Sequence, residues 1–347
     1  MSQQLIDERS RRELIEKFQR ELENEVGLSV FVGPENEEYC DFTVQLCEEL
    51  SELDSRIAPT VYQDSDGEAI RLAITRTPTL LIGSDQGYRV RYTGAPVGQE
   101  AGGFIEAISL VSRGESGLQG DSRAKLQNVD RDVSIQVYVT PNCPHCPRAV
   151  LLAHQIAIES KGWVGSECVE ASQNMDLARQ FNVSSVPQQV INGDVDSVSI
   201  GVQPEAKFID DVLRYGSSRY AEIMEAEEAK RALAERLVDA PTGPVTLTER
   251  NFDQAVQKYP MLVVDCWAEW CSPCRMVAPV IEELARDYQG QIVFGKLDVD
   301  HNREVAGRYQ IMSIPTLLIF KGGQLVGTKV GALPRHALEG ELLKYVN

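Results

Sequence analysis

Two pairs of cysteines, each separated by two residues, are the groups in this sequence best suited to covalent chemistry. They are Cys143/Cys146 and Cys271/Cys274, and each pair follows a strand-like apolar segment and opens a helical one. In the first turn of a helix such cysteines face the same side, and the helix N-terminus stabilises the thiolate of the first. The first sulfur would attack a disulfide, and the second would resolve the mixed disulfide.

Metal binding is the alternative chemistry for these pairs. Structural zinc sites take four ligands, usually from two pairs close in sequence, whereas these two pairs are 125 residues apart. Each pair also has its own strand and helix. We therefore expect redox chemistry at both sites and no bound metal.

The residues between the cysteines are candidates for tuning the thiolates. They are Pro144 and His145 in the central pair, and Pro273 in the C-terminal pair. A histidine in this loop can stabilise the thiolate of Cys143, which would favour the dithiol and raise the reduction potential. The alternative is that His145 is only an exposed loop residue.

Both pairs belong to an internal repeat with three copies. Each copy has a strand, a cysteine-containing turn that opens a helix, a proline, and a later glycine before a last helix. The proline follows the last cysteine by 38, 41 and 41 residues, and the glycine follows the proline by 16, 14 and 16 residues. Matching internal spacing predicts repeated domains. The three prolines are Pro78, Pro187 and Pro315.

The first copy has lost its cysteine pair. Glu37 stands at the position of the attacking cysteine, and only Cys40 remains. Cys47 lies two helical turns further on, about 10 Å away, which is too far for a disulfide. We interpret the first copy as a structural or substrate-holding domain, with both cysteines as partly buried helix residues.

The alternation of elements predicts an α/β protein with three tandem domains, each a central mixed β-sheet flanked by helices. We expect domains at 1–117, 118–216 and 243–347, joined before the last by a helical linker at 217–242. The linker is rich in Ala and Glu and ends in Pro-Thr-Gly-Pro, a composition typical of a semi-rigid helical spacer. Within the domains we expect helices over about 40–53, 102–111, 143–161 and 274–288.

The composition excludes some classes of partner. The net charge of −18 over 347 residues argues against nucleic acid and anionic lipid partners. No apolar run is long enough to span a membrane, and the charged, amphipathic segment 1–24 does not resemble a signal peptide. We therefore expect a cytoplasmic protein. The sequence has no glycine-rich nucleotide- or flavin-binding loop, so we expect no cofactor.

The third copy, residues 245–347, resembles thioredoxin through the stretch Val-Asp-Cys-Trp-Ala-Glu-Trp-Cys-Ser-Pro-Cys-Arg at 264–275. The resemblance implies that Cys271 is the nucleophile and Cys274 the resolving thiol. It also implies that Asp265, on a buried strand, takes the proton from Cys274, and that Lys296 lies nearby and tunes Asp265. The alternative for Lys296 is an ordinary surface lysine.

The same resemblance implies a substrate groove beside each cysteine pair. A cis bond before the proline of the repeat would expose the preceding backbone, which could then pair with a substrate strand. The residues expected to line these grooves are Trp270, Ile314, Pro315 and Gly331 in the third copy, and Val186 and Pro187 in the second.

Residues 1 to about 217 resemble the protein disulfide oxidoreductases of archaea and bacteria, which pair two thioredoxin-like units. The stretches that carry this similarity are 92–98, 139–147 and 153–159. The chain departs from that family at Glu37, and Val137 stands where the third copy has Asp265. The Pro-His dipeptide also occurs in the strongly oxidising enzyme DsbA, which implies electron flow from Cys271/Cys274 to Cys143/Cys146.

The sequence thus predicts a protein disulfide oxidoreductase, made of three tandem thioredoxin folds, that reduces, forms or isomerises disulfides in proteins. Its two centres would exchange electrons internally, and a separate thioredoxin-reductase-like flavoprotein would supply electrons from NADPH. Two alternatives remain open. One is a dedicated relay between such a reductase and a peroxidase, and the other is a chaperone or scaffold that uses thioredoxin folds to bind clients.

Overall fold

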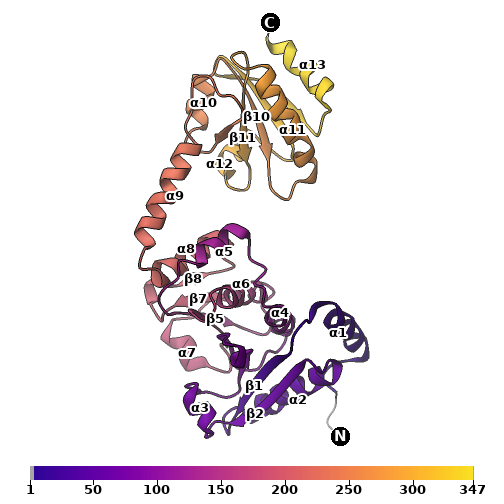
Figure 1. Cartoon of the computed structure of the whole chain (residues 1–347), viewed down its shortest axis with the longest axis vertical. Coiled ribbons are helices and arrows are strands. Elements are labelled where there is room, and N and C mark those ends of the chain that lie inside the picture. The colour runs from indigo at the N-terminus through magenta and orange to yellow at the C-terminus, as the bar shows by residue number, and fades with distance from the viewer. Residues whose placement is uncertain (1–3, 347) are drawn as a thin grey trace. The chain divides into compact units, whose positions relative to one another are not determined.

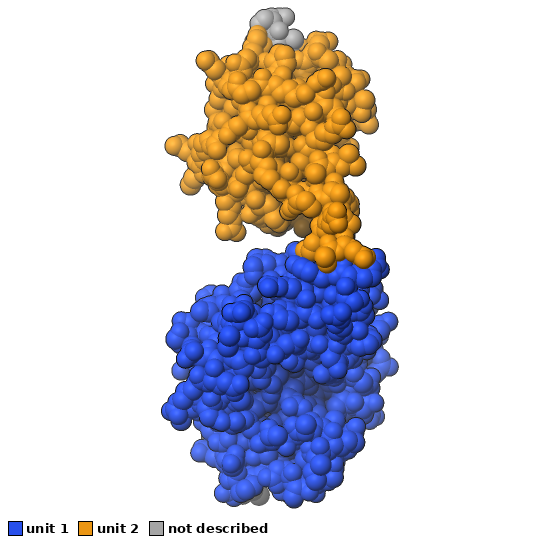
Figure 2. All heavy atoms as spheres, turned by 90° about the vertical axis from the view of Figure 1, so that its left-hand side faces the viewer, with its two compact units in different colours: residues 1–220 blue, residues 221–347 orange. Residues whose placement is uncertain are grey.

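The computed structural model describes residues 4–346. The chain divides into two compact units, unit 1 (Met1–Tyr220) and unit 2 (Ala221–Asn347), which are coloured separately in Figure 2. No helix among the described residues combines the length and the apolar character needed to cross a bilayer.

Unit 1 contains one eight-stranded mixed sheet in the order β2-β1-β3-β4-β6-β5-β7-β8. In each half, the first strand pairs with one parallel and one antiparallel neighbour, β1 with β2 and β3, and β5 with β6 and β7. Parallel pairing of β4 with β6 joins the halves. The strands are β1 (Val26–Val32), β2 (Ile57–Gln63), β3 (Thr79–Ile82), β4 (Val90–Thr93), β5 (Val133–Val139), β6 (Val164–Glu170), β7 (Gln188–Ile191) and β8 (Ser199–Ile200).

The helices of unit 1 cover the two faces of this sheet unequally (Figure 1). One extended core contains buried residues of α1, α2, α4, α6 and α8, whereas α3 and α7 cover small separate clusters on the other face. The helices are α1 (Glu8–Glu21), α2 (Glu37–Leu53), α3 (Gly67–Arg71), α4 (Glu100–Arg113), α5 (Gly120–Leu126), α6 (Cys146–Glu159), α7 (Met175–Gln180) and α8 (Glu205–Gly216), with short 3-10 turns η1 (Ser84–Gln86) and η2 (Val195–Ser197).

Unit 2 contains a five-stranded sheet in the order β13-β12-β10-β11-β9, with a hydrophobic core on each side. Its central strand β10 pairs in parallel with β11 and antiparallel with β12, as β5 does with β6 and β7 in unit 1. The elements are α9 (Tyr220–Ala234), β9 (Val245–Leu247), α10 (Phe252–Lys258), β10 (Met261–Trp267), α11 (Ser272–Asp287), β11 (Val293–Asp298), α12 (Arg303–Arg308), β12 (Thr316–Lys321), β13 (Gln324–Val330) and α13 (Arg335–Val346).

The structure confirms the predicted α/β class with mixed sheets and refines the helix ends. Helix α6 begins at Cys146, because Cys143 belongs to the preceding turn, and α4 extends two residues beyond the prediction at each end. Strand β2 was not predicted, since it lies at the sheet edge and its burial does not alternate. The first two copies share one sheet, and the boundaries drawn at 117, 216 and 242 stay predictions.

Helix α9 lies inside the predicted linker, and its end is held by residues of the third copy. The Arg250 guanidinium lies 3.0 Å from a Glu228 carboxylate oxygen and 3.4 Å from one of Glu235. The Asn251 side chain also donates a hydrogen bond to the Glu235 carbonyl, 2.8 Å long. These contacts fix the C-terminal part of the spacer to unit 2.

At Gly98 the backbones of the two halves of unit 1 lie close together. Its φ of +64° is left-handed, and a Cβ there would lie 2.4 Å from the Pro141 carbonyl oxygen. The next residue, Gln99, donates its N–H to the same oxygen at 3.0 Å. The backbone before α4 is therefore fitted directly to the loop that carries Cys143.

We predict that Gly98→Ala lowers the free energy of unfolding of unit 1. The loss should exceed the roughly 1–2 kcal/mol that a left-handed backbone costs an alanine, because the new Cβ would also clash with the Pro141 carbonyl oxygen. Gly87→Ala is the matched control, because Gly87 also has positive φ but open space around its Cβ position. Hydrogen exchange of unit 1 peptides across a urea series measures both losses. Equal losses in the two variants would show that contact with Pro141 does not matter.

Candidate active sites

The C-terminal cysteine pair lies between strand β10 and helix α11. Cys271 is the N-cap of the helix, and its Sγ accepts a hydrogen bond from the Cys274 N–H at 3.2 Å. The two sulfurs are joined as a disulfide, and both residues are buried. Pro273 is exposed in the first helical turn, which carries no acidic residue. The helix N-terminus thus faces Cys271 without a competing negative charge from that turn.

A buried carboxyl group lies on the strand that leads to this pair. Asp265 on β10 is 1% exposed, and neither of its oxygens has a hydrogen-bond partner. Burial raises the pKa of Asp265 to about 6, while the positive charge of Lys296 lowers it. Lys296 pairs with Asp265 across β10 and β11, and its Nζ lies 5.1 Å from the centre of the Trp267 ring. Asp265 can therefore change charge near neutral pH.

Exposed apolar side chains accompany the C-terminal pair. The Ile314–Pro315 bond is cis, and the Gly331 N–H donates to the Pro315 carbonyl at 2.8 Å. Trp270 is 68% exposed, and its Nε1 donates to Asp300 at 2.7 Å. Met312, two residues before Ile314, is 92% exposed. The sequence analysis missed Met312, although an apolar residue in a proline-containing loop was a usable signal.

The central pair has the same local arrangement at the end of β5. The Cys146 N–H donates to Cys143 Sγ at 3.1 Å, and the two sulfurs form a disulfide. Pro144 and His145 are exposed, and His145 at the N-cap position makes no capping hydrogen bond through its side chain. The Val186–Pro187 bond is cis, with the Gly201 N–H donating to the Pro187 carbonyl at 2.8 Å.

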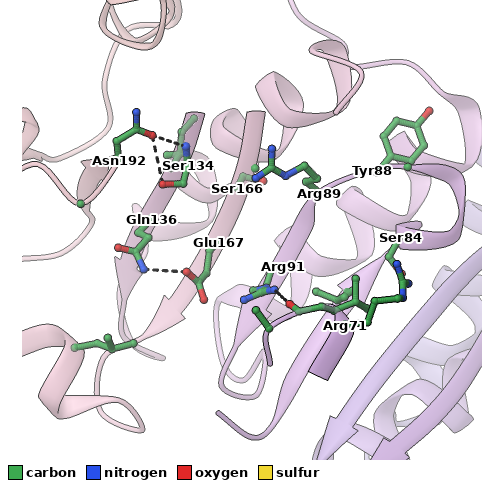
Figure 3. Close-up of a pocket in the computed structure, with 18 of the residues that line it drawn as sticks. Arg71, Ser84, Tyr88, Arg89, Arg91, Ser134, Gln136, Ser166, Glu167 and Asn192 are labelled. Carbon is green, nitrogen blue, oxygen red and sulfur yellow. Dashed lines mark hydrogen bonds between the residues drawn. The ribbon is translucent and has the colours of Figure 1, made fainter. Parts of the chain in front are cut away.

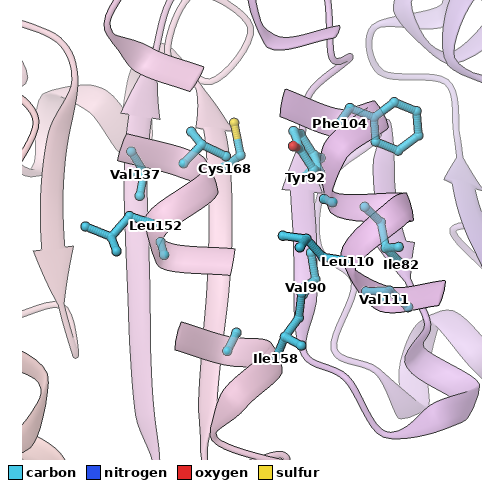
Figure 4. Close-up of a cluster of buried hydrophobic side chains, with 14 of the residues drawn as sticks. Ile82, Val90, Tyr92, Phe104, Leu110, Val111, Val137, Leu152, Ile158 and Cys168 are labelled. Atoms are coloured by element: carbon cyan, nitrogen blue, oxygen red, sulfur yellow. The ribbon is translucent and has the colours of Figure 1, made fainter. Parts of the chain in front are cut away.

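The strands beneath the central pair lack the acid and the lysine found in unit 2. Val137 occupies the position of Asp265, and its partner across β5 and β6 is Cys168, in the register position that Lys296 has in unit 2. Both residues are buried, and Figure 4 shows them side by side on neighbouring strands. The central pair therefore has neither a carboxyl group nor an amine at these two register positions.

Glu100, in the first turn of α4, is a carboxyl group that reaches this region. It is 2% exposed, its Oε2 lies 4.0 Å from Cys168 Sγ, and its Oε1 has no hydrogen-bond partner. A Cβ at Gly103 would lie 3.6 Å from Pro147 Cβ and 3.8 Å from Glu100 Oε2. The carboxyl group and the residue after Cys146 thus flank the same glycine.

Burial raises the pKa of Glu100 to about 7. The thiol of Cys168 has its pKa raised by burial and by the charge of Glu100, so Cys168 stays protonated. The sequence analysis missed Glu100 because it lies in a different copy of the repeat from the cysteines that it approaches. The available signal was its place on the apolar face of α4, in line with Phe104, Ala107 and Ile108.

The corresponding region of the first copy is closed by its own side chains. Asn36 Nδ2 donates to the carbonyl of Thr77, the residue before cis-Pro78, at 3.0 Å, and Thr77 Oγ1 donates to the Glu35 carbonyl at 3.1 Å. Cys40 is buried and unoxidised. This geometry favours the structural interpretation of the first copy, because the backbone that would pair with a substrate is already occupied.

Cys168 and Cys266 are confirmed as core residues, whereas Cys40 and Cys47 are more deeply buried than the predicted partial burial. Cys40, Cys47, Cys168 and Cys266 are all buried and free, and burial raises the pKa of Cys47 and of Cys266 to about 12. Within residues 4–346 no group of three or more His, Cys, Asp or Glu side chains is arranged to hold a metal ion.

Comparison with known families assigns two segments of the chain. The profile of the family described as Thioredoxin matches residues 243–344, and that of the family described as Thioredoxin domain matches residues 133–214. Thioredoxin of Alicyclobacillus acidocaldarius is 48% identical over 98 residues, which are 28% of this chain and 93% of the relative. Thioredoxin of Staphylococcus aureus is 49% identical over 102 residues, 29% of this chain and 97% of the relative.

Solved structures extend the similarity to a larger part of the chain. A protein disulfide oxidoreductase from Aeropyrum pernix K1 is 33% identical with a TM-score of 0.55, covering 60% of this chain and 92% of that protein. The N-terminal domain of the alkylhydroperoxide reductase AhpF from Enterococcus faecalis is 20% identical with a TM-score of 0.53, covering 59% of this chain and 99% of the domain. At that identity the second likeness shows the fold alone.

Two dithiol–disulfide pairs stand at helix N-termini beside cis-proline loops. The aligned segments cover more than nine tenths of thioredoxins that are nearly half identical to this chain and of a protein disulfide oxidoreductase that is one third identical. The chain therefore belongs to the thioredoxin family of thiol–disulfide oxidoreductases, and it joins a protein disulfide oxidoreductase unit to a C-terminal thioredoxin domain.

Proposed function

We propose that Cys143/Cys146 and Cys271/Cys274 both exchange disulfides with protein substrates and also exchange electrons with each other. The observation that carries the proposal is the matching geometry of the two pairs: a disulfide at a helix N-terminus, beside a cis-proline whose carbonyl accepts a glycine N–H. Pro144, His145 and Pro273 would tune the thiolates.

In unit 2, reduction of a substrate would proceed in two displacements. The Cys271 thiolate attacks the substrate disulfide, whose S–S bond breaks, and one substrate thiolate leaves. Cys274 then gives its proton to the Asp265 carboxylate and attacks Cys271 Sγ, which releases the second substrate thiolate. The cysteine pair loses two electrons, and the substrate disulfide gains them. Lys296 keeps the pKa of Asp265 from rising further.

In unit 1, Cys143 would attack and Cys146 would resolve, with Glu100 as the proton acceptor in place of the acid that β5 lacks. Because Glu100 lies on α4, the first copy would supply the proton acceptor for the cysteine pair of the second copy. Burial alone raises the pKa of Glu100 to about 7, whereas the charge of Lys296 also lowers the pKa of Asp265. Glu100 would remain a competent base at neutral pH, where about half of it is ionised.

Substrates would bind as extended segments. The backbone beside each cis-proline would pair with a substrate strand, and apolar side chains would contact the substrate flanks. The residues proposed for this are Ile314, Pro315, Gly331 and Trp270 in unit 2, and Val186 and Pro187 in unit 1.

We also propose that a separate NADPH-using flavoprotein reduces the Cys271/Cys274 pair and that the protein works in the cytoplasm. The four cysteines outside the active pairs are buried free thiols, which suits a reducing compartment. Disulfide-containing proteins would be the clients of the central pair.

We predict that Cys143→Ser and Cys271→Ser each abolish exchange at their own centre, because the attacking thiolate is lost. If the two centres work in series, each variant also abolishes reduction of a client by the flavoprotein and the full chain. Cys40→Ser is the control and should keep full activity, since Cys40 has no thiol partner. NADPH consumption with a disulfide-bonded peptide measures this. Full activity in Cys143→Ser would mean that the C-terminal pair acts alone.

We predict that the pair 271/274 has the lower reduction potential of the two, so that electrons pass to the pair 143/146. Equilibration of the full chain in graded thiol/disulfide buffers, with trapping of each pair for mass spectrometry, gives both potentials. The opposite order would reverse the proposed direction and make the central pair the donor.

We predict that Asp265→Asn and Glu100→Gln each slow the resolving step of their own centre by about a hundredfold above pH 7, where the wild-type carboxylate accepts the proton. The wild-type rate should rise with pH through about 6 in unit 2 and about 7 in unit 1. Single-turnover stopped-flow kinetics measures this. Glu106→Gln, on the same helix as Glu100, is the control and should leave both profiles unchanged.

Asp265 should speed the resolving step but lower the stability of the folded protein above pH 6. Measuring both effects separates a catalytic role of Asp265 from a structural one. The folded pKa of Asp265 lies above its ordinary value of 3.8. Native protein therefore binds more protons than unfolded protein between those values, and the free energy of unfolding falls as pH rises through this window. Asp265→Asn should be slower yet more stable than wild type at pH 8. A variant that is slower and less stable at pH 8 would contradict this assignment.

A further inference from the structure

The face of the unit 1 sheet that carries α3 and α7 contains a cavity of about 830 Å³. Its floor is formed by the middle strands β4, β6 and β5, and its sides by α3 and the region around α7. We name this space the α3–α7 cavity. None of the four active-site cysteines lines it, so it is separate from the redox chemistry. Its size is typical of sites for small molecules.

The charge in the α3–α7 cavity is opposite to that of the whole chain. Three arginines line it, Arg71, Arg89 and Arg91, with Glu167 as the one carboxylate, although the net charge of the chain is −18. Figure 3 shows Arg89 and Arg91 between Glu167 on one side and Arg71 on the other. An anion entering this cavity would meet a local excess of positive charge.

Arg91 is the arginine with the most capacity left for a ligand. Arg71 is bonded to both oxygens of Glu68, and Arg89 to Asp132 and the Gly162 carbonyl. The half-buried Arg91 donates at 3.0 Å to a neutral group, the Leu72 carbonyl. A guanidinium has five N–H donors, and two parallel ones fit a carboxylate or phosphate.

The acid that pairs with Arg91 in the sheet register is directed away from it. Glu167 pairs with Arg91 across β4 and β6, yet its two oxygens accept hydrogen bonds from Thr93 and from Gln136, the latter at 2.9 Å. Among the described residues no ion pair joins the two side chains. Arg91 therefore faces the cavity with its charge uncompensated by a direct carboxylate contact.

The cavity also has an apolar wall. Leu72 and Leu81 lie on the α3 side, and Leu177 and Phe181 on the α7 side. Such a combination of a fixed cation and apolar sides suits a ligand with one anionic group and a compact apolar body.

We propose that the α3–α7 cavity binds a small organic anion, whose carboxylate or phosphate is held by Arg91 and whose apolar part lies against the leucines and Phe181. The proposal is independent of the thiol chemistry, since it concerns residues that line neither cysteine pair.

The first test is amide chemical-shift mapping of the full wild-type chain with three probes: phenyl phosphate, benzoate and benzyl alcohol. We expect at least one anionic probe to shift the amides of Gly87, Gly165 and Gly193, which line the cavity, and the neutral alcohol to leave them in place. Response to phenyl phosphate alone assigns a phosphate ligand, and response to benzoate alone a carboxylate. If no probe shifts these amides, or if the alcohol binds equally well, the proposal is wrong.

The second test compares dissociation constants in variants. Arg91→Met should weaken binding of the anionic probe by about tenfold or more, because charged hydrogen bonds are lost. Arg12→Met is the matched control, since Arg12 also donates to a backbone carbonyl, that of Glu8, but lies on α1 outside the cavity.

A further variant tests the proposal with the Arg91 side chain in place. It is needed because Arg91→Met also removes the hydrogen bond from Arg91 to the Leu72 carbonyl. Ser134→Asp adds a negative charge at an exposed position of the cavity and leaves Arg91 intact. This variant should also weaken binding of the anionic probe. Exchange activity at Cys143/Cys146 checks that both variants are folded. Unchanged binding in Arg91→Met and Ser134→Asp would overturn the proposal.

Discussion

The parallel pairing of β4 with β6 is the contact on which the rest of unit 1 depends. It aligns Val90–Thr93 with Ser166–Val169 and turns two four-stranded sheets into one. Because α4 follows β4 in the chain, the pairing also fixes the start of α4 beside α6, with the backbone at Gly98 fitted to the Pro141 carbonyl. The pairing of β4 with β6 therefore also places Glu100 next to Cys168.

The two active centres place a carboxyl group in a poorly solvated position by different routes. In unit 2, Asp265 lies on the strand before the cysteines, and Lys296 on the neighbouring strand moderates the effect of burial on its pKa. In unit 1, the equivalent positions are Val137 and Cys168, and Glu100 enters from a helix of the other half. The same physical effect, desolvation of a charge, raises the pKa in both places.

The parts of this structure that sequence reasoning predicted are those encoded in short spacings. The two cysteines of each pair are separated by two residues, and Pro187 and Pro315 follow their pairs at the same separation; the resemblance to thioredoxin, rather than the spacing, implied the cis bonds that the structure shows at both prolines. Glu100 could not be found in this way, because it lies 43 residues before Cys143 in another copy of the repeat. Nor could pattern alone show that two sheets would merge, since edge pairing depends on tertiary contacts.

The hydrogen bond from Asn36 to Thr77 has a consequence for how the protein handles its clients. A thioredoxin-like groove that could still receive an extended peptide, but had no dithiol, would form dead-end complexes and compete with the two active grooves. In the first copy the Thr77 carbonyl is already used by Asn36 Nδ2, so a peptide would first have to displace a contact made within the same chain. The copy that lacks the first cysteine thus also has its cis-proline loop carbonyl hydrogen-bonded within the chain, which would disfavour such dead-end complexes.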